Sequence, residues 1–227
     1  MRRFLRSGRR RTEVRRGTLK RAPHFPAVVA HARRLQPPVI LIILALLAAT
    51  VLSAADTPYW IEPCTNPETS CVAGDVQLAR WALDAWQEAS NGRLHFVKTE
   101  NRANAVIRVV WATPSQGLYG EAMPIEVNGR RGAQIFVRIA DSGTKDPLLR
   151  DTIVYLTCLH ESGHALGLPH TNKFDDIMYS FQFGGDIPEY FARYRRKLTS
   201  RNDIRKNSGL SPADRARIAE RVAPADQ

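Results

Sequence analysis

Acidic residues are almost absent from the first 55 residues of this 227-residue chain. Twelve Lys or Arg and a single acid, Glu13, precede Asp56, out of totals of 33 basic and 22 acidic residues, so the remainder holds 21 of each sign. The formal net charge of +11 and the pI of 10.1 therefore describe an N-terminal tail. This distribution argues against a basic nucleic-acid-binding domain, and no nucleic-acid partner is expected.

Charged side chains are absent altogether from residues 39–55, VILIILALLAATVLSAA. The run lies at the lower length limit for crossing a bilayer and also resembles a long signal-peptide core. It is apolar on every face, unlike an ordinary amphipathic core helix. Arginines lie before it and none within it, which orients its N-terminus toward the cytoplasm. Ser53-Ala54-Ala55 reads as a cleavage site, whereas the long basic leader favours an uncleaved anchor, so both alternatives stay open.

Three parts are therefore expected along the chain. Residues 1–38 form a basic disordered tail, 39–55 a signal peptide or signal anchor, and 56–227 a folded domain. Either fate of 39–55 places the domain outside the cytoplasm, membrane-anchored with the N-terminus inside or secreted after cleavage. The membrane is a partner only if 39–55 is uncleaved. The arginines of the tail are read as a topology signal.

Cysteine is also scarce, with three residues in the chain. Cys64 and Cys71 flank the polar stretch TNPETS and can close a small disulfide, which fits an oxidising compartment. Cys158 lies in an apolar helical stretch and is expected to be a buried thiol, although its pairing with Cys64 or Cys71 stays open.

Helical and strand-like patterns follow one another after Asp56. Apolar residues recur at helical spacing over 75–91, and strand-like runs cover 93–100 and 105–112. Asn128-Gly129 separates two further strand-like runs and is a strong hairpin signal. There is no internal repeat. This order predicts an α+β domain with a twisted sheet that is mostly parallel or mixed.

Two more helices have clear start signals. Asp146 as N-cap and Pro147 at the first position open a helix of about twenty residues, which Gly167 ends. Ser211 and Pro212 open a short C-terminal helix in the same way.

Histidine is scarce as well, yet three of the six histidines lie within HESGHALGLPH. On a helix, His160 and His164 project from the same face one turn apart. Gly167 can adopt the left-handed conformation, which would swing His170 back toward them. Three protein ligands leave the fourth position of a tetrahedral zinc ion for water, as in catalytic sites. The pattern predicts one catalytic Zn²⁺.

HESGHALGLPHT followed by DDIMYS resembles the metzincin clan of zinc endopeptidases, which share the long histidine motif and a later methionine turn. Thr171, directly after the third histidine, resembles the Ser/Thr type of the matrixin family. LARWALDAW, ANAVIRV and LSPADRARI also lie where a matrixin has its first helix, second strand and last helix. The resemblance covers 75–179 and 210–222. It implies a metzincin-like domain with a twisted mixed sheet, a long active-site helix and a small C-terminal subdomain.

The resemblance also implies a function and the residues that perform it. The chain would be a zinc-dependent endopeptidase that hydrolyses peptide bonds of a protein or peptide substrate through a zinc-activated water. The alternative is a membrane-tethered, non-catalytic binding protein with the same fold. It would be favoured by a missing base or ligand, and none is missing. The implied roles are zinc binding by His160, His164 and His170, general-base catalysis by Glu161, a hydrophobic floor at Met178, a pocket wall at Tyr179, and pairing with extended substrate along Gly120, Glu121, Ala122 and Met123.

The sequence also departs from the matrixin pattern. It has no cysteine-switch motif and no stretch resembling the structural zinc and calcium loops of that family. Ser180 stands where matrixins usually have proline. The basic stretch 181–209 is longer than the family norm. It could shape the specificity pocket, contact anionic lipid, or form a solvated loop.

Overall fold

The structure of the protein, a computed structural model, describes residues 56–114, 119–139 and 145–223. The tail predicted over 1–38 and the apolar segment predicted over 39–55 lie outside these ranges. Within the described ranges, none of the helices combines the length and apolar character needed to span a membrane.

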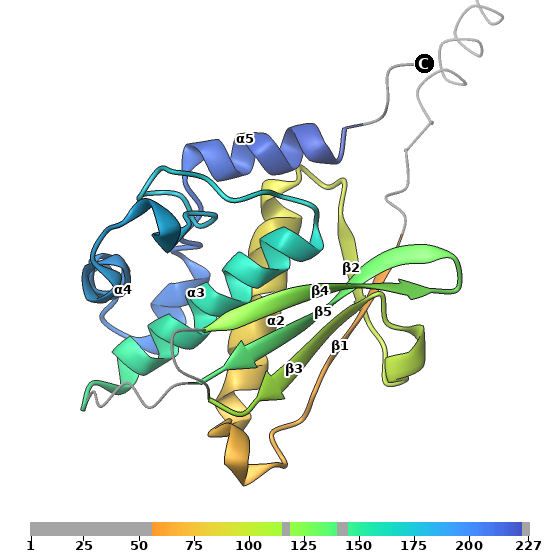
Figure 1. Ribbon diagram of the computed structural model, residues 1–227, viewed down its shortest axis with the longest axis horizontal. Coiled ribbons are helices and arrows are strands. Elements are labelled where there is room, and N and C mark those ends of the chain that lie inside the picture. Colours follow the sequence, from red (N-terminus) through yellow and green to blue (C-terminus); the bar gives the residue numbers. More distant parts are fainter. Residues whose placement is uncertain (1–55, 115–118, 140–144, 224–227) are drawn as a thin grey trace, which may run out of the picture. The chain divides into compact units, whose positions relative to one another are not determined.

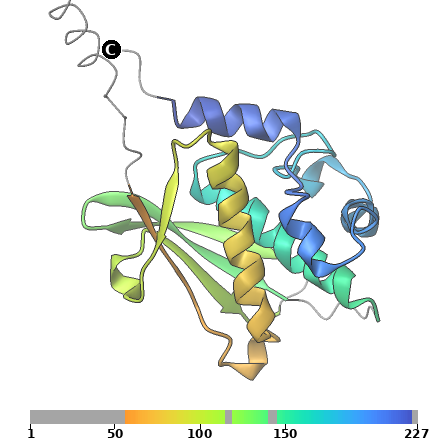
Figure 2. The same ribbon diagram turned by 180° about the vertical axis from the view of Figure 1, so that it is seen from behind.

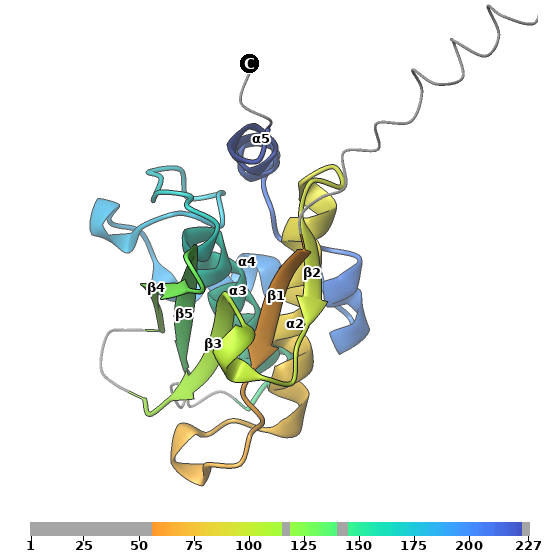
Figure 3. The ribbon, with the colours of Figure 1, turned by 90° about the vertical axis from the view of Figure 1, so that its right-hand side faces the viewer.

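A five-stranded mixed sheet in the order β2-β1-β3-β5-β4 forms one layer of the domain (Figures 1 and 3). The strands are β1 (Asp56–Ile61), β2 (His95–Lys98), β3 (Ile107–Ala112), β4 (Gly120–Val127) and β5 (Arg130–Arg138). The pairs β1–β2, β1–β3 and β3–β5 are parallel, and β4–β5 is antiparallel. The predicted mixed α+β sheet is confirmed, although β1 had no sequence signal strong enough to be predicted.

The hairpin between β4 and β5 turns at Asn128 and Gly129, as predicted. Both residues have positive φ, 51° and 75°. This pair of left-handed residues matches the twist of the strands that it joins. Strand β4 precedes this turn and pairs only with β5, so it lies at the outer edge of the sheet, with one side of its backbone unpaired by any other strand of the described sheet.

Two long helices, α2 (Ala73–Ala89) and α3 (Pro147–Ala165), cover one face of the sheet (Figures 1 and 2). Trp86 of α2 is fully buried, and its indole nitrogen donates to the Leu159 carbonyl of α3 at 2.9 Å. Each large apolar side chain buried between helices and sheet contributes about 1.5–3 kcal/mol. The largest of these fully buried side chains are Trp86, Tyr155, Leu78, Leu83, Ile135 and Leu159.

The end of the chain forms a smaller region beside α3. The basic stretch after the methionine contains the 3-10 helix η3 (Phe181–Phe183), helix α4 (Ile187–Arg195) and the 3-10 helix η4 (Arg201–Arg205). The last helix, α5 (Pro212–Arg221), begins as predicted at Ser211, whose hydroxyl accepts from the Asp214 amide. The small C-terminal subdomain therefore includes α4 as well as α5.

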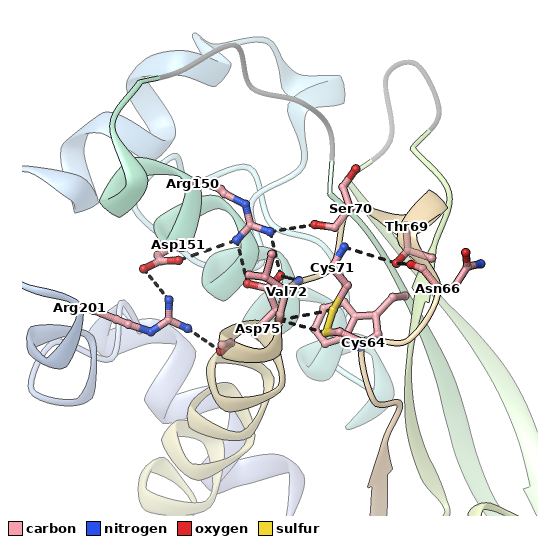
Figure 4. Close-up of polar contacts among 12 residues, drawn as sticks. Cys64, Asn66, Thr69, Ser70, Cys71, Val72, Asp75, Arg150, Asp151 and Arg201 are labelled. Atoms are coloured by element: carbon pink, nitrogen blue, oxygen red, sulfur yellow. Dashed lines mark hydrogen bonds and ion pairs between the residues drawn. A yellow bond between two sulfur atoms is a disulfide. The ribbon is translucent and has the colours of Figure 1, made fainter.

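Ionic contacts join the N-terminal ends of α2 and α3 (Figure 4). The Asp75 carboxylate is fully buried and accepts two hydrogen bonds from Arg150, both at 2.8 Å. The same carboxylate accepts from the Val72 amide at 2.9 Å. Next to it, Asp151 and Arg201 form an ion pair at 2.6 Å. These charges fix the start of the helix that carries the histidine motif.

The loop before α2 is closed by a disulfide between Cys64 and Cys71, with 5.3 Å between their Cα atoms. The Ser70 carbonyl inside this loop accepts from Arg150 at 3.0 Å. The disulfide loop is thus tied to α3. Cys158 is a free thiol buried in α3, where burial raises its pKa far above the usual range.

Candidate metal centre and active site

Helix α3 places His160 and His164 on one face, one turn apart, with ring centroids 4.8 Å from each other. The helix ends at Gly167, whose φ is +84°, and the Leu168 amide donates back to the Gly163 carbonyl at 3.0 Å. The reversed chain brings the Nε2 atom of His170 to 3.0 Å from Nε2 of His164 and 3.3 Å from Nε2 of His160. The predicted convergence of three histidines is confirmed.

The histidine triad fits a zinc ion. In a tetrahedral site with Zn–N bonds of about 2.05 Å, two ligand nitrogens lie about 3.3 Å apart. The distances from Nε2 of His170 to the other two Nε2 atoms, 3.3 and 3.0 Å, are close to this value. Nδ1 of His160 lies 2.7 Å from the Ile177 carbonyl, and Nδ1 of His164 lies 2.9 Å from the Leu168 carbonyl. Because a carbonyl only accepts, each Nδ1 must carry the proton, which leaves each Nε2 lone pair for the metal.

The protonation equilibria of the triad also suit a metal. The pKa of His160 is lowered to about 4, chiefly by burial and also by the neighbouring His164 and His170, against the opposing effect of the hydrogen bond to Ile177. Burial and His164 also lower the pKa of His170. At neutral pH these two imidazoles are neutral, so a metal binds them without displacing protons.

Met178 lies directly beneath the metal-binding turn of α3. Its side chain is fully buried, and a Cβ added to Gly163 would lie 2.3 Å from its sulfur. Glycine at 163, between the two helical histidines, is thus required by the close approach of the methionine. The segment that carries Met178 is bonded to the chain after His170, because the Thr171 amide donates to the Met178 carbonyl at 2.8 Å.

The Glu161 carboxylate lies beside the edge strand. A Cβ on Gly120 of β4 would meet Cγ of Glu161 at 2.6 Å and Oε1 at 2.7 Å. Only glycine permits this contact between strand and carboxylate. The pKa of Glu161 is raised to about 7, chiefly by burial and also by the charge of Glu121, while Arg138 opposes both effects.

A cavity of about 440 Å³ contains the histidine triad, Glu161 and part of β4. Of the residues predicted to contact substrate, Tyr179, Gly120, Glu121 and Ala122 line it. Met123 does not line it, and its side chain is 48% exposed. Tyr179 itself is buried and donates from its hydroxyl to the Gly184 carbonyl at 2.7 Å.

Sequence reasoning missed several residues of this cavity. Leu156 and Thr157 lie one helical turn before His160 and Glu161, a spacing that could have identified them. The others had no sequence signal, because loops or α4 bring them to the site. The residues missed are Tyr119, Leu156, Thr157, Ser180, Phe181, Gln182, Tyr190 and Phe191. Four of these eight residues, Tyr119, Phe181, Tyr190 and Phe191, add aromatic side chains to the lining of the cavity.

Comparison with known proteins gives one result that agrees with this geometry. The sequence pattern of a family described as Matrixin matches residues 59–186, more than half of the chain. No curated protein matches the sequence. The matched range includes the sheet apart from the first three residues of β1, together with α2, α3, the three histidines and Met178, and it ends just before α4.

Proposed function

The chain belongs to the matrixin family and is a zinc-dependent endopeptidase with His160, His164 and His170 as its zinc site, and on this premise we propose how its other residues carry out peptide hydrolysis. The observation that carries the proposal is the convergence of three Nε2 atoms in one cavity with the Glu161 carboxylate.

Glu161 is the general base. Zinc, when bound, supplies a Lewis acid that acidifies water and polarises the scissile carbonyl. Glu161 takes the proton of the attacking water and then delivers it to the leaving amine. Its neighbours support this role, since the carboxylate is buried against Gly120 and faces the cavity that holds the triad. Met178, packed against Gly163 between the two helical histidines, forms the hydrophobic floor beneath the metal site.

The substrate lies extended along β4. An edge strand offers unpaired backbone groups to a peptide, which adds to the sheet as a further strand. Gly120, Glu121 and Ala122 line the cavity and supply these groups, with Met123 at the exposed end of the contact. Tyr179 forms part of the wall for the side chain just after the cleaved bond. The aromatic lining of the cavity favours an apolar side chain there.

The domain acts outside the cytoplasm. The disulfide between Cys64 and Cys71 fits an oxidising compartment. Residues 39–55 would carry the domain across the membrane, either remaining as an anchor or being removed as a signal peptide. Cell fractionation of the tagged full chain distinguishes the two, because an anchor keeps the domain in the membrane fraction and cleavage releases it.

The full chain and its Glu161→Gln variant test the base. Both should retain zinc, while cleavage of an unbiased peptide library should fall by about 10²–10⁴-fold in the variant. Glu88→Gln, which changes an exposed carboxylate on α2, is the matched control and should cleave normally. Full turnover by Glu161→Gln would refute the assignment. A zinc-loaded parent with no cleavage of any peptide would favour the non-catalytic alternative.

A further inference from the structure

A second cavity, of about 670 Å³, adjoins the 440 Å³ cavity of the histidine triad, which we call the zinc cleft. It is formed by α4, the segment 206–211 and the first residues of α5, which follow one another beside α3 in Figure 2. Most of this wall lies beyond residue 186, where the matrixin match ends. Most of the cavity wall is therefore built by residues outside the matched range.

Positive charge dominates the lining of this second cavity. Lys197, Lys206 and Arg215 line it with exposed side chains. Lys206 has only a long contact of 3.7 Å with Asp203. Arg215 donates to the Ser208 hydroxyl at 2.6 Å, which holds its guanidinium at the cavity wall. Among the described residues, Lys197 and Arg215 have no carboxylate partner, and the partner of Lys206 is 3.7 Å away.

Asp175, an acidic residue in the lining of this cavity, is paired with an arginine. Asp175 accepts from Arg193 at 2.6 Å. Arg193 is itself held by two aromatic faces, 4.7 Å above Phe174 and 4.5 Å above Tyr190. Asp175 and Arg193 thus cancel each other, and the net charge facing the cavity is that of Lys197, Lys206 and Arg215.

The local charge stands out against the rest of the domain. Residues 187–217 contain nine Lys or Arg and three acids, whereas residues 56–227 as a whole are neutral. Four of these nine, Arg193, Lys197, Lys206 and Arg215, line the cavity, and Arg193 is paired with Asp175. The other three cations provide a favourable potential for an anion there. The Ser208 hydroxyl and the N-terminal end of α5 at Ser211 and Pro212 add neutral polar groups to the same wall.

We propose that this cavity, which we call the basic cleft, binds a phosphate group, either free or as part of a phosphate ester such as a lipid headgroup. Two mobile ammonium groups and one fixed guanidinium provide the donors that phosphate oxygens require. The volume accommodates a headgroup-sized ligand. The assignment is independent of the catalytic roles proposed above.

The basic cleft shares walls with the zinc cleft. Leu156 and Tyr190 line both cavities. Ile177 lines the basic cleft, and its carbonyl is the one that contacts Nδ1 of His160 at 2.7 Å. A phosphate bound in the basic cleft would therefore lie against Ile177, which contacts His160. Its binding could thus affect the metal centre through this one residue.

Binding is tested with the zinc-loaded full chain and two charge-matched double variants. Lys197→Gln with Lys206→Gln removes two cations of the basic cleft. The control, Arg80→Gln with Lys98→Gln, removes two exposed cations elsewhere in the domain. The basic N-terminal tail is present in both double variants. Calorimetric titration with inorganic phosphate should show one saturable site, about tenfold weaker in the cleft variant and unchanged in the control.

A second experiment, with lipid vesicles, distinguishes a lipid headgroup from a soluble phosphate. The three proteins are sedimented with vesicles of phosphatidylcholine alone or mixed with phosphatidylglycerol. Weaker binding of only the cleft variant to the anionic vesicles identifies a headgroup, and equal binding of all three identifies a soluble phosphate. Absence of saturable phosphate binding, equal affinity in both double variants, or binding of a glutamate-rich peptide in place of phosphate would overturn the proposal. None of these readouts depends on peptide cleavage.

Discussion

Asp214 of α5 holds the backbone of Ile177, the residue that orients the first zinc ligand. Oδ2 of Asp214 accepts from the Ile177 amide at 2.8 Å, and the Ile177 carbonyl lies 2.7 Å from Nδ1 of His160. Asp214 is fully buried and is also paired with Arg217 at 3.1 Å. The last helix is therefore connected to the metal centre through one residue.

Replacing Asp214 should weaken both folding and zinc binding. Asp214→Ala removes the acceptor of a buried amide and leaves Arg217 with one partner fewer, so the free energy of unfolding should fall by about 1–3 kcal/mol. Loss of support behind His160 should weaken zinc binding by about tenfold or more. Urea unfolding and competition with a zinc chelator measure the two effects. Glu220→Ala, an exposed acid on the same helix, should change neither. A stability loss with unchanged zinc affinity would contradict the connection to His160.

Gly163 offers a test of the packing beneath the zinc site. Alanine in place of glycine inside a helix normally stabilises by about 0.5–1 kcal/mol. Here the new Cβ would lie 2.3 Å from the Met178 sulfur and 3.0 Å from Trp86, so Gly163→Ala should instead cost about 1–3 kcal/mol. Urea unfolding shows whether Gly163→Ala raises or lowers the free energy of unfolding. In a Met178→Ala background the same substitution should cost much less, and an equal cost in both backgrounds would show that Met178 is not the obstacle.

The features predicted from the sequence are those fixed by residues close together in the chain. Asn128-Gly129 makes its turn with its own backbone, and Asp146 accepts from the amides of Leu148 and Leu149. The zinc triad needed only helical spacing and one left-handed glycine, so it too was predicted and is confirmed. The roles of Glu161 and of the β4 residues stay predictions, because they concern a substrate.

The features that were not predicted depend on distant partners. Strand β1 is held between β2 and β3, whose residues lie more than 30 positions further along the chain. Nothing in the local sequence DTPYWI predicts that this segment pairs with those two strands. Helix α4 has a weak local pattern, and its contribution to the zinc cleft through Tyr190 and Phe191 arises only when it packs beside α3. Tertiary contacts of this kind are not encoded in a short window of sequence.

The buried ion pair between Asp75 and Arg150 should matter far more than an exposed pair of similar length. Arg150→Met would leave the fully buried Asp75 carboxylate without its charge partner and should cost about 3–5 kcal/mol. Lys98→Met breaks the exposed pair with Glu100, at 2.6 Å, and should cost less than about 1 kcal/mol. Urea unfolding of both variants gives the comparison. Similar costs would mean that water or another group compensates Asp75 when the arginine is lost.

Asp176 should make the free energy of unfolding depend on pH in the acidic range. Burial raises the pKa of Asp176, but hydrogen bonds from Arg217 at 2.6 Å and Ser211 at 2.7 Å outweigh burial and hold the pKa below its usual value. A carboxylate whose pKa is lower in the folded state stabilises the protein above the unfolded pKa of about 3.9. This contribution is lost as the pH falls through the folded value.

Arg217→Gln should therefore destabilise the protein most at neutral pH. At pH 7 the free energy of unfolding should fall by about 1–3 kcal/mol, and the difference from the parent should shrink steadily below about pH 4 as Asp176 becomes protonated in both proteins. Urea unfolding across a pH series measures this, and release of zinc in acid affects parent and variant alike. Arg80→Gln, which breaks an exposed contact of 3.9 Å with Asp84, should show a small difference at every pH. If the Arg217→Gln difference were independent of pH, its origin would be packing of the arginine side chain and not its charge on Asp176.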